Sequence, residues 1–369
     1  MKRNTRNSAL AVMAAATFAL TACGNDLAGN SPEPSVAQQE NWNEGGEVQI
    51  AAPDAEQANG VRIAFLGNSR DNPFSEYMFR AVEDEAQRYG ATAEFVGPTN
   101  FDAQEQYQLV SDIAVGQQYD VILIIPNDSA SITPAVEAAA AAGIPTVALN
   151  QPIGPDILSD QIQAEGVVSQ IVEDLELNAT AMADGTIAAC ENKDPCKVEV
   201  LWGVRSLLFD KVKPDIFYAA LADHPNIEIV CETDAEYTQD LGRTQAADCL
   251  QANPDLNVIA SQADESTRGA ESSVVAAGRT VGTGPDDVRL VSSYGTMYAI
   301  DQIREGHWDM TTYNRPQSTG RAGVRIALSH LQGDEVPEYV RMEHLDGDPF
   351  MLTKEVLDAN PQIVGQWEG

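Results

Sequence analysis

Loops rich in asparagine, glutamine and aromatic residues are the parts of this 369-residue chain that could do chemistry. Each loop follows an apolar, strand-like run, and the loops comprise residues 67–74, 126–129, 150–152, 203–213, 237–239, 262–265, 294–296 and 314–316. Planar amides and carboxylates can satisfy the hydroxyls of a polyol, and aromatic faces can stack on the C–H face of a sugar ring. The composition of these loops therefore favours recognition of a small polyhydroxylated molecule.

The common motifs of catalysis and of cofactor binding are missing from these loops. The chain has no Gly-x-Ser-x-Gly nucleophile elbow and no Gly-x-x-x-x-Gly-Lys phosphate loop, and its first loop lacks Gly-x-Gly-x-x-Gly. The four histidines are scattered, which favours packing or surface roles. We expect no catalytic residue, no cofactor and no metal. Carboxylates such as Asp128, Asp264 and Glu265 leave a secreted glycoside hydrolase as a minor alternative.

The N-terminus has the features of an export signal. Three basic residues, Lys2, Arg3 and Arg6, precede an apolar run over residues 9–20, which is too short to span a bilayer. The small residues before Cys23 resemble a bacterial lipobox, which implies cleavage before Cys23 and a lipid on that cysteine. We predict a signal peptide over residues 1–22 and a membrane-anchored protein outside the cytoplasm. An ordinary cleaved signal is the alternative.

Four cysteines remain once Cys23 is assigned to the lipid, an even number that suits disulfides in an oxidising compartment. Cys190 and Cys196 flank a short turn-rich loop, whereas Cys231 ends a strand-like run and Cys249 lies in the helix that follows. We expect pairing between nearest neighbours. A zinc site is the alternative, and it is disfavoured because there is no Cys-x-x-Cys and no histidine at ligand spacing.

Residues 24–60 contain few large apolar side chains, so we predict a flexible tether over residues 23–60. The net charge of the chain is −34, and removal of residues 1–22 takes away three positive charges, leaving −37. Such a surface repels nucleic acid, which we exclude as a partner. No later segment is long and apolar enough for a transmembrane helix.

From residue 61 the chain alternates apolar runs with helical stretches. The expected strands are 61–66, 93–96, 121–125, 144–149, 198–202, 227–231, 258–261, 288–292 and 310–313. The expected helices are 75–89, 102–117, 133–142, 215–221, 239–251, 266–277, 297–305 and 319–331. This alternation predicts an α/β fold with parallel sheets in two lobes. Ligands of such folds bind outside the carboxyl ends of the strands, where the polar loops lie.

Several motifs in this order resemble one family. They include Val-Arg-Ile-Ala-Phe-Leu-Gly at 61–67, Asn-Pro-Phe at 72–74 and Asp-Val-Ile-Leu-Ile-Ile-Pro-Asn-Asp-Ser at 120–129. Over about residues 61–345 the chain resembles the periplasmic sugar-binding proteins of ABC importers, most closely the ribose-binding type. The resemblance implies two Rossmann-like lobes joined by a three-segment hinge. The N-terminal lobe would be 61–173 plus 315–343, and the C-terminal lobe 174–314 plus 344–369.

The resemblance also implies which residues touch the ligand. The first loop places Asn68, Asn72 and Phe74 beside the sugar, and Asn150 and Gln151 stand where ribose binders usually have an Asp-Arg pair. The Asn72-Pro73 pair is equally a good helix-entry turn, and Asn150 can serve as a turn former.

In the second lobe the implied contacts depart further from the family pattern. Tyr237 matches a stacking aromatic, Lys213 lies near a family arginine, and Asp264 follows an alanine that replaces a family asparagine. Tyr294 replaces a family aspartate and Asn314 matches a family glutamine. Because typical sugar sites use paired ions, this pocket predicts an unusual sugar, a sugar alcohol or another small polar ligand.

The function implied is that of a monomeric, lipid-anchored solute-binding protein. It would close on its ligand between two lobes and deliver it to an ABC permease. A ligand-binding subunit of a chemosensory or two-component system would use the same lobes to contact a receptor, and the sequence leaves this alternative open.

Overall fold

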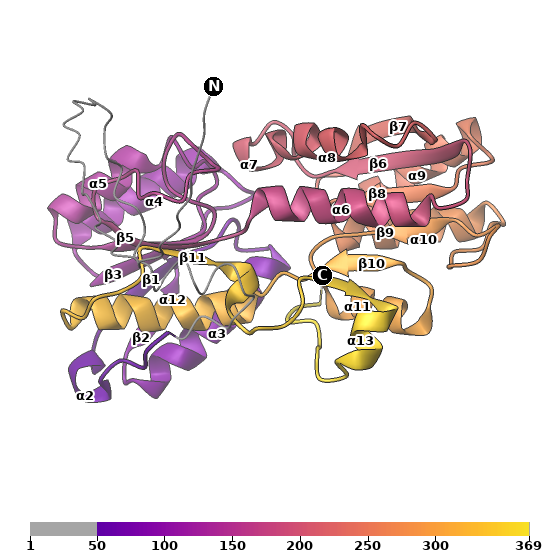
Figure 1. The fold of residues 1–369 in the computed structure, drawn as a ribbon. Coiled ribbons are helices and arrows are strands. Elements are labelled where there is room, and N and C mark those ends of the chain that lie inside the picture. The colour runs from indigo at the N-terminus through magenta and orange to yellow at the C-terminus, as the bar shows by residue number, and fades with distance from the viewer. Residues whose placement is uncertain (1–49, 369) are drawn as a thin grey trace, which may run out of the picture. The chain divides into compact units, whose positions relative to one another are not determined.

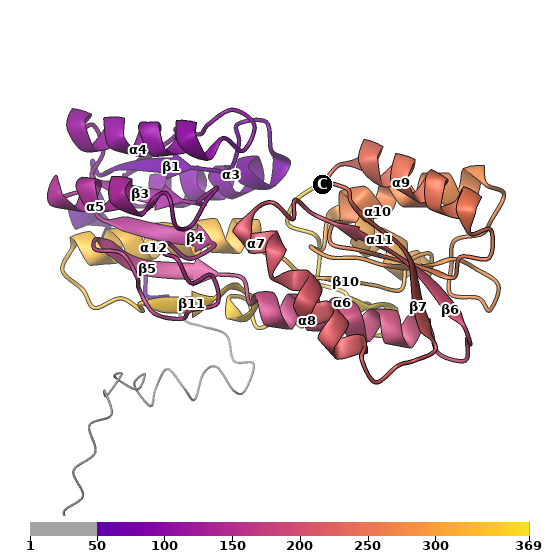
Figure 2. The same ribbon diagram turned by 90° about the horizontal axis from the view of Figure 1, so that it is seen from above.

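The computed structural model describes residues 50–368, and these residues build two six-stranded sheets with helices on their faces (Figures 1 and 2). The predicted signal peptide, Cys23 and the tether up to residue 49 lie outside the described residues. Between residues 50 and 368, none of the helices has both the length and the apolar character that crossing a bilayer requires.

The first sheet is parallel throughout and has the strand order β11-β5-β4-β3-β1-β2. Its strands are Arg62–Leu66 (β1), Thr92–Phe95 (β2), Val121–Ile124 (β3), Thr146–Asn150 (β4), Val167–Val172 (β5) and Tyr339–Arg341 (β11). Successive side chains of β1 point to opposite faces. Ile63 and Phe65 pack with α3 (Pro73–Arg88) and α12 (Pro316–Leu331), whereas Ala64 and Leu66 pack with α4 (Ala103–Gly116) and α5 (Thr133–Ala141).

The second sheet has the order β12-β10-β9-β8-β6-β7, and only its edge strand β12 runs antiparallel. Its strands are Cys196–Trp202 (β6), Ile227–Asp234 (β7), Val258–Ser261 (β8), Arg289–Val291 (β9), Met310–Thr312 (β10) and Met351–Thr353 (β12). One face packs against α6 (Leu175–Ala189) and α8 (Lys213–Leu221). The other packs against α9 (Gln239–Ala252), α10 (Asp264–Ala276), α11 (Met297–Glu305) and α13 (Lys354–Ala359).

The chain passes between the two sheets three times. The passages follow β5, β10 and β11, because β11 belongs to the first sheet and β12 to the second. The predicted α/β class with two parallel-dominated sheets is confirmed. The residue limits of the two lobes stay predictions.

The end of the predicted tether is folded, which corrects the prediction that it extends to residue 60. Helix α2 (Ala55–Ala58) begins after Asp54, whose carboxylate accepts hydrogen bonds from the amides of Glu56 and Gln57. Ala58 is buried in the core of the first lobe, and Gln332 holds the backbone of Asp54 through two hydrogen bonds. Composition averaged over 24–60 concealed these few anchoring side chains.

The bounds of the expected strands and helices differ from the observed ones by a few residues at most. The sequence analysis did not predict β5 and α6. Nine of the fifteen residues of α6 are buried, so this helix lacks the one-sided apolar pattern of a surface helix. The short elements α7 (Leu208–Lys211), β11, β12 and α13 were also missed.

Both expected disulfides are present. Cys190 is bonded to Cys196, with the two Cα atoms 5.6 Å apart, and joins the end of α6 to β6. Cys231 of β7 is bonded to Cys249 of α9, with the Cα atoms 6.1 Å apart. Nearest-neighbour pairing is confirmed, and the zinc alternative for these cysteines is wrong.

Glu199 is an unpaired carboxyl group in the core of the second lobe. It lies in the middle of β6, is fully buried, and neither of its carboxyl oxygens has a hydrogen-bond partner. Burial raises the pKa of Glu199 to about 8. The folded state therefore binds a proton that the unfolded chain releases near pH 4.5, and this contribution to stability is lost as the pH rises through 8.

We expect Glu199→Gln to gain stability relative to the parent as the pH rises from about 5 to 8. The gain should reach up to about 1.4 kcal/mol per pH unit, because the glutamine has no proton to lose. Urea unfolding of the full chain at several pH values measures the difference. Glu228→Gln, an exposed change on the neighbouring strand β7, is the control and should parallel the parent. Parallel pH curves for the parent and Glu199→Gln would contradict the assignment.

Candidate ligand-binding site

A cavity lies where the carboxyl ends of the strands of both sheets face each other. Its volume is about 80 Å³, so it holds several waters or one small polar ligand. Its walls include Asn68 after β1, Asn150 at the end of β4, Tyr237 after β7 and Tyr294 after β9. This is the edge at which ligands bind to open α/β sheets.

Eight of the ten predicted ligand-binding residues line this cavity. They are Asn68, Asn72, Phe74, Asn150, Gln151, Tyr237, Tyr294 and Asn314. They come from segments as far apart as β1 and β10, so the fold brings together residues that the resemblance had assigned one by one. Their contact with a ligand stays a prediction.

An amide pair forms the floor of the cavity in the first lobe. The side-chain amide of Asn68 donates to Oδ1 of Asn127 at 3.2 Å, and Nδ2 of Asn127 donates to the carbonyl of Asn68 at 2.9 Å. Gln106 of α4 accepts from the backbone amide of Asn127 at 2.8 Å and donates to two loop carbonyls. The loops after β1 and β3 are thus held in place without a ligand.

The start of α3 brings Asn72 and Phe74 to the cavity. Oδ1 of Asn72 accepts a hydrogen bond from the amide of Ser75 at 2.9 Å, so Asn72 is the N-cap of this helix. Its helix-entry role is therefore confirmed, and its NH₂ group and the second lone pair of Oδ1 are left for a ligand. The ring of Phe74 packs edge-on against Trp367, with centroids 5.5 Å apart.

Two asparagines present buried acceptors without partners. Asn150 ends β4 with a positive φ of 64°, a conformation that asparagine tolerates better than most residues. Oδ1 of Asn150 and Oδ1 of Asn314 are both buried and accept no hydrogen bond within residues 50–368. Buried polar atoms are nearly always paired in folded proteins, so these two oxygens indicate a place for a donor.

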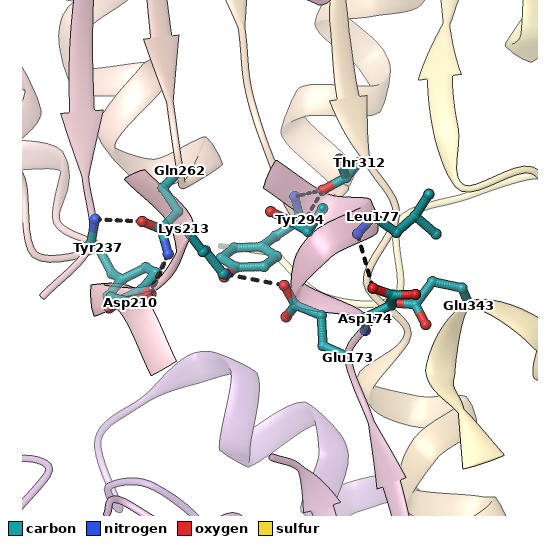
Figure 3. A network of polar contacts seen from close by, with 12 residues as sticks. Glu173, Asp174, Leu177, Asp210, Lys213, Tyr237, Gln262, Tyr294, Thr312 and Glu343 are labelled. Atoms are coloured by element: carbon teal, nitrogen blue, oxygen red, sulfur yellow. Dashed lines mark hydrogen bonds and ion pairs between the residues drawn. The ribbon is translucent and has the colours of Figure 1, made fainter. Parts of the chain in front are cut away.

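Lys213 does not line the cavity, in contrast to its predicted ligand contact. It begins α8, is 1% exposed, and donates to Glu173 at 3.1 Å and to the hydroxyl of Tyr294 at 2.8 Å (Figure 3). Burial alone lowers the pKa of Lys213, but the charges of Glu173, Tyr294 and Asp210 outweigh it and raise the pKa above its usual value. Lys213 is therefore a buried cation that positions cavity residues.

Asp210 organises the second-lobe wall. One of its carboxylate oxygens accepts from the hydroxyl of Tyr237 and from Nε2 of Gln262, and the other accepts from the amide of Val204 at 2.7 Å (Figure 3). Burial raises the pKa of Asp210, although the charge of Lys213 and these hydrogen bonds oppose the rise. The ring of Tyr237 is thereby held in stacked contact with Tyr294, with centroids 6.1 Å apart.

Tyr237 and Tyr294 both have positive φ, at 58° and 101°. Such backbone conformations cost free energy for bulky residues and persist where the surrounding structure requires them. Tyr294 is held by hydrogen bonds from its amide to Thr312 at 3.1 Å, and its carbonyl accepts from Nε1 of Trp367 at 3.3 Å. The strain at two stacked tyrosines in one cavity supports a functional role for their rings.

Asp264, which we predicted to contact the ligand, does not line this cavity and is hydrogen-bonded inside the protein. Its carboxylate accepts from Ser292 at 2.6 Å, from Thr311 at 2.9 Å and from the amide of Thr296 at 2.7 Å. Burial raises its pKa to about 6, against these hydrogen bonds. The neighbouring Glu265 lines the cavity instead.

Sequence reasoning missed part of the cavity wall. The missed residues are Phe101, Asn127, Glu173, Leu207, Phe209, Asp210, Glu265 and Trp367. Five of them lie in loops that were already assigned to the site by their position after a strand, and only their side chains were overlooked. Trp367 comes from the C-terminal segment, and its sequence neighbours carry no signal that links it to the site.

A fold of two α/β units around a cavity of amides and aromatic rings defines a class of solute-binding proteins. The family model of the periplasmic binding protein domain matches residues 63–335. The chain belongs to this family of extracytoplasmic, non-enzymatic binding proteins. The predicted resemblance is confirmed, and the hydrolase alternative is set aside.

Two curated relatives illustrate the similarity. The chain is 26% identical over 278 residues to the ribose import binding protein of Bacillus subtilis, covering 75% of this chain and 84% of that protein. It is 30% identical over 260 residues to the D-apiose import binding protein of Actinobacillus succinogenes, covering 70% of this chain and 78% of that protein.

Solved structures agree on the fold. An ABC transporter solute-binding protein from Mycobacterium smegmatis with bound glycerol aligns with a TM-score of 0.69 at 25% identity, covering 84% of this chain and all of that one. The myo-inositol binding protein of Caulobacter with bound myo-inositol aligns with a TM-score of 0.69 at 20% identity, covering 82% and 96%. The second likeness concerns the fold alone.

We expect Lys213→Met to destabilise the protein by about 3–5 kcal/mol, because it leaves Glu173 and Asp210 buried without their cation. Urea unfolding of the full chain measures the loss. Lys197→Met is a matched control in the same lobe, since Lys197 pairs with the exposed Asp255 at 2.8 Å. Loss of such a surface pair should cost at most about 1 kcal/mol. Equal losses for the two variants would contradict the structural role of Lys213.

Proposed function

We propose that this protein captures a sugar or a sugar-like polyol in the cavity and delivers it to an ABC permease. The observation that carries the proposal is the cavity wall itself, which combines asparagine and glutamine side chains with aromatic rings. Amides supply a donor and an acceptor side by side, which suits vicinal hydroxyls, and the rings suit the C–H face of a pyranose or cyclitol.

The relatives support a ligand of this kind. Those reported above are named for ribose and D-apiose, and the Mycobacterium smegmatis structure contains glycerol. Our proposal follows the shared chemistry of these molecules, which is a small ring or chain with a hydroxyl on almost every carbon.

The ligand would favour a closed arrangement because it contacts residues of both lobes. Asn68 and Phe74 come from the first lobe, and Tyr237 and Tyr294 come from the second. A ligand shifts a conformational equilibrium only by the difference in its affinity for the two states. Simultaneous contact with both walls supplies that difference, and a permease could then recognise the closed form.

The test of this proposal is a thermal-shift screen of the full chain against sugars, polyols, nucleosides and amino acids. A ligand that binds only the folded state raises the melting temperature, and the shift grows with concentration over Kd. We expect hits among sugars or polyols. Hits among nucleosides or amino acids alone would overturn the ligand class, and the absence of any shift in a folded sample would overturn the solute-binding proposal for this cavity.

With the ligand found by that screen, Phe74→Ala should weaken binding about tenfold, equivalent to ~1.4 kcal/mol. The variant removes an aromatic wall of the cavity while the Asn72 cap stays in place. Phe79→Ala is the matched control on the same helix, because Phe79 packs on Phe65 and Phe95 and does not line the cavity. Calorimetric titration separates the two, and an unchanged Kd for Phe74→Ala would exclude this wall from the site.

We also propose that Cys23 carries the lipid that holds the protein at the outer face of the cell membrane. Expressed in a bacterium, the parent should incorporate labelled fatty acid and sediment with membranes. Cys23→Ser should do neither, whereas Thr21→Ser, which keeps a small residue in the lipobox, should behave like the parent. A membrane-bound Cys23→Ser protein would refute the anchor.

A further inference from the structure

The charge of the cavity is one-sided. Three carboxyl groups line it, those of Glu173, Asp210 and Glu265, and no lysine, arginine or histidine lines it between residues 50 and 368. Glu173 is paired with Lys213, and both oxygens of Asp210 accept hydrogen bonds within the protein, whereas Glu265 has no salt bridge among residues 50–368. The acidic excess therefore carries information on the ligand beyond its hydroxyls.

The nearby cation is already occupied. Lys213 donates to Glu173 and to the hydroxyl of Tyr294, and its ammonium group lies 4.2 Å from the ring centroid of Phe209. It is 1% exposed, so no side of it is free for a ligand carboxylate or phosphate. The cavity thus offers an anionic ligand no cationic partner among the described residues.

The unpartnered buried atoms of the cavity wall are all acceptors. They are Oδ1 of Asn150, Oε2 of Glu173, Oε2 of Glu265 and Oδ1 of Asn314. Asn150, Glu173 and Asn314 are 7%, 6% and 5% exposed, so water does not satisfy these oxygens freely. Two of the four atoms are carboxylate oxygens, which can only accept when ionised. A ligand group that only donates fits such a wall best.

Aromatic rings also line the cavity near these unpartnered acceptors. Tyr237 and Tyr294 are stacked, and Glu265 lines the same cavity at the start of α10. Ring faces attract ammonium groups, and the contact of Lys213 with Phe209 shows that the wall already uses this interaction. Carboxylates beside ring faces are a good site for a protonated amine.

We propose that the ligand is a polyol that bears a protonated amine, such as an amino sugar or an aminocyclitol, and that Glu265 accepts from its ammonium group. This inference rests on the proposed function and narrows its ligand class. The amides of Asn68, Asn72 and Gln151 would pair with the hydroxyls. Glu265 would be the negative partner of the ligand's ammonium group, as Glu173 is of Lys213.

The pKa of Glu265 would depend on whether a cation lies beside its carboxyl group. Burial raises the pKa of Glu265 to about 8, and the charge of the adjacent Asp264 adds to the rise. Burial and the charge of Asp264 disfavour the ionised form of Glu265, and a cation placed beside it would favour that form.

The test compares matched ligands on the full chain by calorimetric titration at neutral pH and 150 mM salt. Each set contains a neutral parent, its amino derivative and its acidic derivative: glucose, glucosamine and glucuronic acid; galactose, galactosamine and galacturonic acid; and inositol with an amino-inositol. We expect at least one set in which the amino derivative binds tenfold or more tightly than the neutral parent. The acidic derivative should bind most weakly, and methylammonium alone should not bind.

Each outcome separates the inference from the proposed function. Neutral parents that bind as tightly as their amino derivatives would overturn the inference and leave the sugar-binding proposal intact. Failure of every sugar and cyclitol to bind would overturn both. Binding of methylammonium as tightly as the amino derivatives would assign the preference to the acidic surface of the protein and overturn the specific site.

A substitution at Glu265 tests whether this residue causes the preference for the amino derivative. Glu265→Gln keeps the size of the side chain, and it should remove most of the tenfold preference for the amine over the neutral parent. Glu305→Gln, an exposed change on α11 of the same lobe, is the control and should keep the full preference. A preference that survives in Glu265→Gln would overturn the role of Glu265.

Discussion

The buried contact of Lys213 with Glu173 is the interaction on which the geometry of the site depends. Glu173 directly follows β5 of the first sheet, and Lys213 begins α8 beside the second. Each of the two charges would be costly alone in an interior, and a buried pair is stable only with good geometry and further hydrogen bonds. The hydroxyl of Tyr294 and the ring of Phe209 supply those further contacts.

This pair also decides the electrostatics of the cavity. A lysine that projected into the space would pair with anionic ligands, but here it is held behind Tyr294 and neutralised by Glu173. The cavity is therefore left with amides, carboxyl groups and rings, and with no lysine, arginine or histidine among residues 50–368. Lys213 and Tyr294, two positions at which the resemblance implied a departure from the family pattern, contact each other directly.

The first lobe contributes a different kind of wall. Its amides are fixed by one another and by Gln106, and Asn72 is fixed by capping α3. Polar groups that are already oriented lose little freedom on binding, so preorganised amides favour affinity. The segment after β12 adds Trp367, which contacts Phe74 of the first lobe and the carbonyl of Tyr294 of the second. The closing end of the chain thus touches both walls.

Local information in the sequence was sufficient for much of this protein. The alternation of apolar runs and helical stretches determined the α/β class, since side-chain periodicity depends only on near neighbours. The turn-forming pair Asn72-Pro73 marked the start of a helix, and the spacing of four cysteines was enough for their pairing. Eight of the ten residues that the family resemblance assigned to the ligand line the cavity, and all eight lie in loops that position after a strand had marked.

Only the tertiary structure decided which side chain of a loop faces the ligand space. Asp264 and Glu265 are adjacent in the sequence, but the carboxylate of Asp264 accepts hydrogen bonds from Ser292, Thr296 and Thr311, whereas Glu265 lines the cavity. The burial of Lys213 and the arrival of Trp367 depend in the same way on packing between segments far apart in the chain. Such contacts arise from long-range packing, which local periodicity and turn propensity do not encode.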